Sequence, residues 1–331
     1  MTQRTAIYWC LFLLLFLTVS LIVQVTEAAH SRRRPVARRE STPKYDRAIT
    51  TFSNDGRLLQ VEYGMKAADR GDTVAAMAVS LTDNGNTDGS RDEYGFVCIA
   101  VAGSSERKVQ RIDEHVLLMS SGLSGDMGLV AKILRRYCQQ HRMAFGEAPT
   151  VQEVSKYLAE IQHGLTKVSG TRPLGCSCIV AGLDVSPEDD GLPGIVRLFG
   201  VEAGGILEEY TFCAVGKGRA KATKVLEELE RKVMDSNNDI EQPDKGQKDR
   251  PIPILQSVSQ GVTDAVFLSA DDGGSKSSTD QKLDLWIIRC DPHRRQGRGK
   301  IHIACAKDLN RNKATLMSSL IGNAWSSDTL E

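Results

Sequence analysis

Apolar residues recur along this chain with two different periods, and segments of each kind come in runs. Short apolar stretches that are bounded by turn residues predict buried strands. Segments in which apolar residues lie three and four positions apart predict amphipathic helices. The expected strands lie at 73–81, 96–102, 116–119, 176–183, 195–201, 210–215, 283–290 and 300–306. The expected helices lie at 58–68, 129–138, 151–165, 216–234 and 254–266.

The order of these elements favours one class of fold. A first helix is followed by strands, two helices, strands, two helices and strands. Because strands and helices come in separate runs, the order favours stacked antiparallel sheets flanked by helices over a doubly wound parallel sheet. We therefore predict an α+β fold with two antiparallel sheets between helix layers. Gly71 is expected to end the first helix, and Thr150 is expected to cap the helix that begins at Val151.

The N-terminus differs from the rest of the chain. Arg4 precedes an uninterrupted apolar run over 6–23, and small residues near Ala28 provide a cleavage site. This pattern predicts a signal peptide over 1–29, and a membrane anchor stays open because spanning takes roughly 20 residues. A buried core helix or a wrongly included upstream start codon would also account for the apolar run. The Arg- and Pro-containing segment 30–44 is expected to be a basic linker.

Composition narrows the function classes further. The chain has 331 residues, of which 25% are charged, and its formal net charge is zero. It therefore lacks a global field that would attract nucleic acid, and the basic cluster at 294–298 is expected to be a solvated loop.

The eight cysteines lie at positions 10, 98, 138, 176, 178, 213, 290 and 305. Since no pair has CxxC spacing, we predict buried, reduced thiols and neither a metal site nor a cofactor. His115 has no partner at ligand spacing and is expected to be structural.

One segment is more specific than any of these patterns. Residues 45–63 have the sequence YDRAITTFSNDGRLLQVEY. This string resembles the N-terminal signature of proteasome alpha-type subunits, and its start resembles the fourth-type eukaryotic alpha subunit. RPLGCS at 172–177 and AVGKG at 214–218 resemble a strand entry and a strand-to-helix turn of the same family. The resemblance covers roughly 45–290, which leaves 291–331 as a C-terminal extension.

The resemblance implies a fold and a working assembly. The fold would be a four-layer alpha–beta–beta–alpha sandwich, the Ntn-hydrolase fold. The chain would be a noncatalytic member of a heteroheptameric alpha ring that caps the beta rings and gates the axial pore. The gate residues carry over to Tyr45, Asp46, Arg47 and Tyr63. The family's proline is replaced by Asn54, which removes a fixed backbone angle from the turn.

The resemblance also implies a pocket in which the C-terminal tails of activators dock. Its residues carry over to Glu62, Gly71, Gly122 and Leu123. The lysine that would bind the tail carboxylate is not in the strand, which has the sequence CIAVAGS at 98–104 where the family has Val-Glu-Lys. A tail carboxylate would lose its main cationic partner there, which argues against docking of the regulatory particle or other activators.

The expected function is that of an alpha-ring subunit of the 20S core in ubiquitin-dependent protein degradation, with other alpha and beta subunits as partners and no nucleic acid. The family implies the cytoplasm and nucleus, whereas a functional leader implies the secretory route or a membrane. Two alternatives stay open. One is a diverged paralogue of the same fold that is sent through the secretory route. The other is a threonine hydrolase matured at Thr73, although that residue fits a strand better and the activating lysine is again missing.

Overall fold

The computed structural model describes residues 48–83, 92–184, 195–238, 251–270, 282–291 and 300–310. By its contacts the chain divides into two units, residues 1–47 and residues 48–331, and all described residues belong to the second. The expected leader, the basic linker, Tyr45, Asp46 and Arg47 lie outside the described residues, as does the basic cluster at 294–298. In the part of the chain that is described, no helix is both long and apolar enough to cross a membrane.

The first sheet contains five antiparallel strands in the order β10-β9-β2-β1-β8. Its members are β1 (Val74–Asp83), β2 (Asp92–Ala102), β8 (Phe212–Val215), β9 (Leu283–Asp291) and β10 (Lys300–Leu309). Val74 on β1, which lies between β2 and β8, is opposite Val101 on one side and opposite Val215 on the other. The edge strand β10 falls within the segment that was expected to be a C-terminal extension, so this segment contributes to the sheet.

The second sheet also contains five antiparallel strands, in the order β3-β4-β5-β6-β7. Its members are β3 (Val109–Arg111), β4 (Val116–Gly122), β5 (Cys176–Asp184), β6 (Ile195–Val201) and β7 (Leu207–Glu209). A tight turn joins β6 to β7, in which the Gly205 N–H donates to the Glu202 carbonyl at 2.8 Å. Gly205 has a φ of +85°, which is the left-handed conformation that such turns require and glycine adopts without strain.

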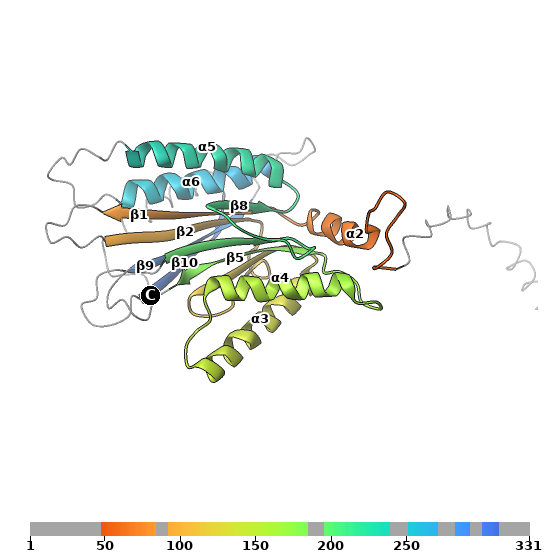
Figure 1. Ribbon diagram of the computed structural model, residues 1–331. Helices are drawn as coiled ribbons and strands as arrows, with labels where there is room; N and C mark the ends of the chain where they lie inside the picture. Colours follow the sequence, from red (N-terminus) through yellow and green to blue (C-terminus); the bar gives the residue numbers. More distant parts are fainter. Residues whose placement is uncertain are drawn as a thin grey trace, which may run out of the picture. The chain divides into compact units, whose positions relative to one another are not determined.

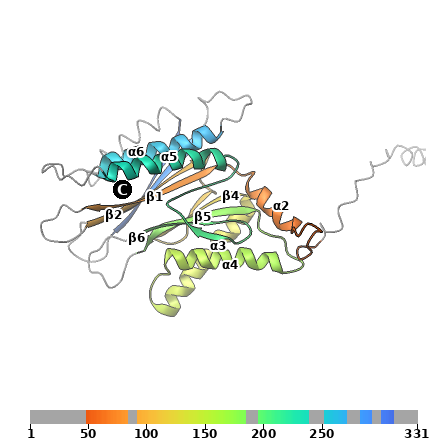
Figure 2. The same cartoon turned by 45° about the horizontal axis from the view of Figure 1, so that its top comes forward.

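Helices cover the outer face of each sheet, so that the described part of the unit 48–331 has four layers (Figure 1). The helices α5 (Arg219–Asn238) and α6 (Pro251–Ala270) pack on the first sheet, and α3 (Ser124–Phe145) and α4 (Val151–Lys167) pack on the second. Figure 2 shows the same order of layers from a second direction. The predicted α+β sandwich of two antiparallel sheets between helix layers is thereby confirmed.

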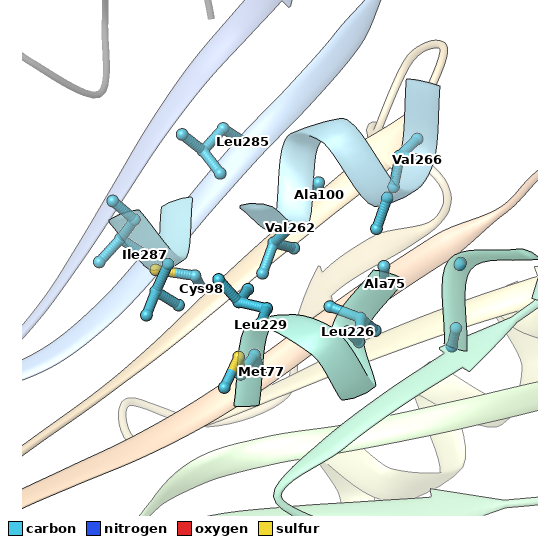
Figure 3. Close-up of a cluster of buried hydrophobic side chains, with 14 of the residues drawn as sticks. Ala75, Met77, Cys98, Ala100, Leu226, Leu229, Val262, Val266, Leu285 and Ile287 are labelled. Atoms are coloured by element: carbon cyan, nitrogen blue, oxygen red, sulfur yellow. The ribbon is translucent and has the colours of Figure 1, made fainter. Parts of the chain in front are cut away.

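Alternating residues of the strands divide the core into an inner and two outer clusters. On β1, Val74 and Ala76 face the second sheet, whereas Ala75 and Met77 face the helices, as the period of two along a strand requires. Figure 3 shows the outer cluster between the first sheet and the helices α5 and α6, where Leu226 and Val262 meet the strand residues. Burial of these apolar faces fixes which side of each strand points inward.

Local sequence chemistry sets several helix ends. Thr150 accepts a hydrogen bond from the Glu153 N–H, and the Glu153 carboxylate accepts one from the Thr150 N–H. This reciprocal pair is a capping box, and the predicted cap of α4 is confirmed. The first described helix, α2 (Leu59–Ala68), ends three residues before Gly71, whose N–H donates to the Ala68 carbonyl at 3.1 Å.

The prediction of buried, reduced cysteines is confirmed for most of the described thiols and wrong for one. Cys98, Cys138, Cys176 and Cys178 are buried free thiols, and Cys213 is half-buried. Cys305 is exposed, because β10 is an edge strand with only one neighbouring strand. The side chains at positions 10 and 290 lie outside the described part of the chain.

Candidate functional site

The described residues line a half-open cavity of about 710 Å³ at the end of α2, where four segments meet. Arg70, Gly71 and Asp72 follow α2, and Gly122 ends β4. Residues of the connection from β2 to β3 and the first turns of α3 complete the wall. The cavity therefore lies at the ends of strands from both sheets, with backbone from a helix end, a turn and a helix start around it.

Close contacts between backbone segments hold this end of the molecule together. A Cβ atom at Gly71 would lie 2.2 Å from the Gly122 nitrogen, and a Cβ at Gly122 would lie 2.2 Å from the Gly175 carbonyl oxygen. Gly122 also has a φ of +124°. The Ser121 hydroxyl donates to the Asp72 carbonyl at 2.8 Å. Gly71 and Gly122, two of the predicted docking residues, are thus brought together in one cavity by contacts that only glycine permits.

A lysine that sequence analysis missed lines the same cavity. The Lys108 ammonium lies 2.5 Å from a carboxylate oxygen of Asp72 and 2.6 Å from the Ala102 carbonyl oxygen. Strand β2 has no lysine at its end, as its sequence shows. Lys108, in the connection from β2 to β3, nevertheless places an ammonium at that end. A Cβ built on Gly103 would lie 3.5 Å from the Lys108 Nζ, so glycine leaves room for the ammonium.

A buried carboxylate fixes the start of α3 beside the cavity. Asp126 accepts hydrogen bonds from both terminal nitrogens of Arg172 at 2.7 Å and from the Gly175 N–H at 2.9 Å. The hydrogen bonds from Arg172 hold the pKa of Asp126 below its usual value, against the effect of burial. Gly175 in turn accepts a hydrogen bond from the Leu123 N–H at 2.9 Å. This network ties the predicted docking residue Leu123, which is exposed, to the cavity wall.

The other described candidates lie on α2 and do not line the cavity. The Glu62 carboxylate pairs with both Nε and one terminal nitrogen of Arg57, with 2.6 Å between Nε and Oε1. These hydrogen bonds lower the pKa of Glu62. Tyr63 is exposed, and the Lys66 ammonium lies 5.8 Å from the centre of its ring. Both predicted residues are therefore on an accessible helix face, with charged neighbours from the same chain.

Thr73, the nucleophile of the alternative hypothesis, is a buried residue in this structure. Its hydroxyl accepts a hydrogen bond from the Gly218 N–H at 3.0 Å. Its own nitrogen is part of a peptide bond to Asp72, whereas an N-terminal threonine nucleophile uses a free amine as its base. The unprocessed chain therefore does not present Thr73 as an activated nucleophile.

His115 has the structural environment that its isolation in the sequence predicts. Its Nε2 lies 2.8 Å from the Pro149 carbonyl oxygen, and the residue is buried. Over the residues that the structure describes, no group of three histidine, cysteine, aspartate or glutamate side chains is arranged to hold a metal ion.

Comparisons with known proteins agree with the signature at the start of the described unit. A family model for the N-terminal signature of A-type proteasome subunits matches residues 45–67, and one described as proteasome subunit matches residues 97–241. Proteasome subunit alpha type-7-1B of Drosophila melanogaster is 32% identical over 188 residues, which are 56% of this chain and 68% of the relative. Proteasome subunit alpha of Methanoregula boonei is 36% identical over 192 residues, 56% of this chain and 71% of the relative. Proteasome subunit alpha type-7 of Caenorhabditis elegans is 33% identical over 196 residues, 56% and 68% of the two chains.

Proposed function

The chain belongs to the proteasome alpha-subunit family, and we propose that it is a noncatalytic subunit of the alpha ring of the 20S core. In this role it contributes to gating of the pore and to assembly for ubiquitin-dependent protein degradation. Its partners are other alpha subunits in a heteroheptameric ring, and the beta subunits. The observation that carries the proposal is the match of the alpha-type signature over residues 45–67, which includes the gate candidates and all of α2 except its last residue.

The gate is assigned to Tyr45, Asp46, Arg47 and Tyr63. A carboxylate beside phenol and guanidinium donors can join neighbouring chains through charge-assisted hydrogen bonds. The exposed position of Tyr63 on α2 supports this assignment.

Docking of activator tails is assigned to the cavity at the end of α2, together with Glu62 and Leu123. Gly71 and Gly122 form part of its wall, and Lys108 supplies the ammonium that the strand does not. A cavity of this volume lies within the range of about 300–1,000 Å³ that is usual for ligand sites. Docking is therefore retained in the proposal, in contrast to what the strand sequence alone indicates.

Copurification tests the ring assignment. The full-length tagged chain is expected in particles that contain the other alpha and beta subunits, when it is isolated from native extract. Its absence from such particles would contradict the proposal. In particles that do form, Asp46→Asn and Tyr63→Phe are expected to change the rate of peptide hydrolysis by the beta subunits without changing incorporation. Unchanged hydrolysis in both variants would count against a role in gating.

Two further measurements separate the alternatives. Mass spectrometry of the mature N-terminus is expected to find no chain that begins at Thr73, and such a chain would support the threonine hydrolase instead. Imaging of the tagged full-length chain is expected to place it in the cytoplasm and nucleus. Localisation to the secretory route would favour the diverged paralogue, for which the apolar run over 6–23 is the motivating observation.

A further inference from the structure

Acidic side chains of the chain itself offset part of the positive charge that lines the cavity at the end of α2. Three basic side chains, those of Arg70, Arg107 and Lys108, face the cavity together with two acidic ones, those of Asp72 and Glu106. Of these, Lys108 and Asp72 are in direct contact, 2.5 Å apart. The only ammonium among these side chains is therefore already bound to a carboxylate of its own chain.

The two partners of this pair are held with unequal firmness. The Lys108 side chain is 17% exposed, and its ammonium is also fixed by the Ala102 carbonyl in the space that Gly103 leaves. The Asp72 side chain is 64% exposed. An ion pair with one exposed partner is weak, because water and salt compete for that partner. Asp72 can leave the pair at little cost, whereas Lys108 stays in place.

We propose that Asp72 is an internal counter-ion that occupies the carboxylate position of the cavity, and that an incoming peptide must displace it from Lys108 with its own C-terminal carboxylate. This inference rests on the proposed function of the cavity as a docking site. The Asp72 carboxylate shows where a ligand carboxylate meets the ammonium. Asp72 thereby lowers the affinity of the cavity for carboxylate-ended peptides and sets a threshold that a ligand must exceed.

The chemistry of the cavity favours a peptide end over a free multivalent anion. Asp72 and Glu106 weaken the attraction of the three basic side chains for a multiply charged ligand such as phosphate, whereas a single carboxylate can replace the single carboxylate of Asp72. Met127 adds an apolar part to the wall, which suits apolar side chains next to the peptide terminus. The occupant is thus a peptide with apolar last residues and a free C-terminal carboxylate.

Substitution of the two partners, with a matched control, tests this inference in the full-length chain. The probes are a fluorescein-labelled heptapeptide with apolar last residues and a free carboxylate, and the same peptide with an amidated end. Asp72→Asn is expected to bind the carboxylate peptide about two- to five-fold more tightly than the unchanged chain, in line with the strength of an exposed ion pair. Its affinity for the amidated peptide is expected to stay the same.

Two variants separate the proposed pair from a general effect of charge. Glu106→Gln makes the same charge change on the cavity wall without touching Lys108, and it is expected to have a smaller effect. Lys108→Met is expected to remove the preference for the carboxylate peptide, and Asp72→Asn is then expected to have no effect in that background. Circular dichroism confirms that each variant is folded.

Three results would overturn the inference. They are an Asp72→Asn effect no larger than that of Glu106→Gln, an effect that persists in the Lys108→Met background, and no binding of either peptide by any variant. Copurification with proteasome subunits reports separately on the proposed function. A chain that is absent from particles but shows tighter binding in Asp72→Asn would refute the ring assignment and leave the counter-ion intact.

Discussion

Replacement of Asp126 by asparagine should destabilise the fold and disturb the wall of the cavity. The aspartate is 6% exposed and accepts three hydrogen bonds, two from Arg172 and one from the Gly175 N–H. Asparagine has nearly the same shape but only one oxygen, and its amide donors would face the donors of Arg172 or Gly175. At least one buried donor would then lose its partner.

The expected size of this effect follows from the exposure of the partners. Hydrogen bonds to a charged group contribute roughly 1.5–3 kcal/mol each. The Arg172 side chain is 60% exposed, so solvent screens much of its share. We therefore expect Asp126→Asn to lower the free energy of unfolding by about 2 kcal/mol in total. Because the unfolding entropy is about 2.1 cal/mol/K per residue, this corresponds to a fall in Tm of roughly 3–4 °C for the unit 48–331.

The dependence on pH gives the prediction a second readout. The pKa of Asp126 in the folded chain lies below its usual value of 3.8, chiefly because of the hydrogen bonds from Arg172. A carboxyl group with a lowered pKa stabilises the fold above its unfolded pKa, and that contribution disappears as the pH falls through the folded pKa. The difference between the unchanged chain and Asp126→Asn should be constant between about pH 5 and 8, and it should shrink below about pH 4.

Thermal and urea unfolding, followed by circular dichroism, measure both effects. Glu160→Gln is a matched control, because it makes the same charge change at an exposed position of α4, where a change of less than about 0.5 kcal/mol is expected. A stability of Asp126→Asn equal to that of the control would refute the role assigned to this network. A difference that grows as the pH falls would refute the electrostatic explanation.

Three more predictions concern single positions in the fold. Thr150→Ala removes half of the capping box of α4 and should cost about 1 kcal/mol in urea unfolding; a loss below about 0.3 kcal/mol would contradict the cap's role. Gly122→Ala places a Cβ 2.2 Å from a carbonyl oxygen at a φ of +124°, so it should destabilise strongly. Gly128 on α3 has no atom within 4 Å of an added Cβ, so Gly128→Ala should be neutral or stabilise the fold by about 0.5–1 kcal/mol. Equal effects of Gly122→Ala and Gly128→Ala would contradict the close packing around Gly122. The Glu208 carboxylate raises the pKa of Tyr210 to about 12, so absorbance should show a late-titrating tyrosine whose pKa falls in Glu208→Gln. This contact should stabilise the fold below about pH 10 and be lost as the pH rises through about 12.

Long periodic segments were predictable from sequence, because burial of one face imposes a repeat that extends over several turns or residue pairs. The helices α3 to α6 and most strands follow from this repeat. The strands β3 and β7 were missed, since each has three residues, and so short a segment cannot show alternation. Exposure of Cys305 was missed because an apolar segment does not show whether its strand lies at the centre or the edge of a sheet.

The candidate site was predictable only where its residues belong to a contiguous motif. Gly71, Gly122 and Leu123 carry over from the resemblance, and the structure places the two glycines in one cavity. The pairing of Glu62 with Arg57 could have been suspected from the nearness of opposite charges. The contact between Lys108 and Asp72 could not, because it joins residues 36 positions apart through the ends of two strands.

The Lys108 ammonium reaches the end of β2 because the connection between β2 and β3 folds back over that strand. The turn that carries it is closed by a 2.9 Å hydrogen bond from the Lys108 N–H to the Ser105 carbonyl. The Ser105 N–H is bound in turn by the buried carboxylate of Asp284, 2.7 Å away on β9. A residue 179 positions further along the chain therefore helps to direct the lysine back over the end of β2. The absence of a lysine from a strand therefore does not imply the absence of an ammonium at its end, because a neighbouring turn can bring one there.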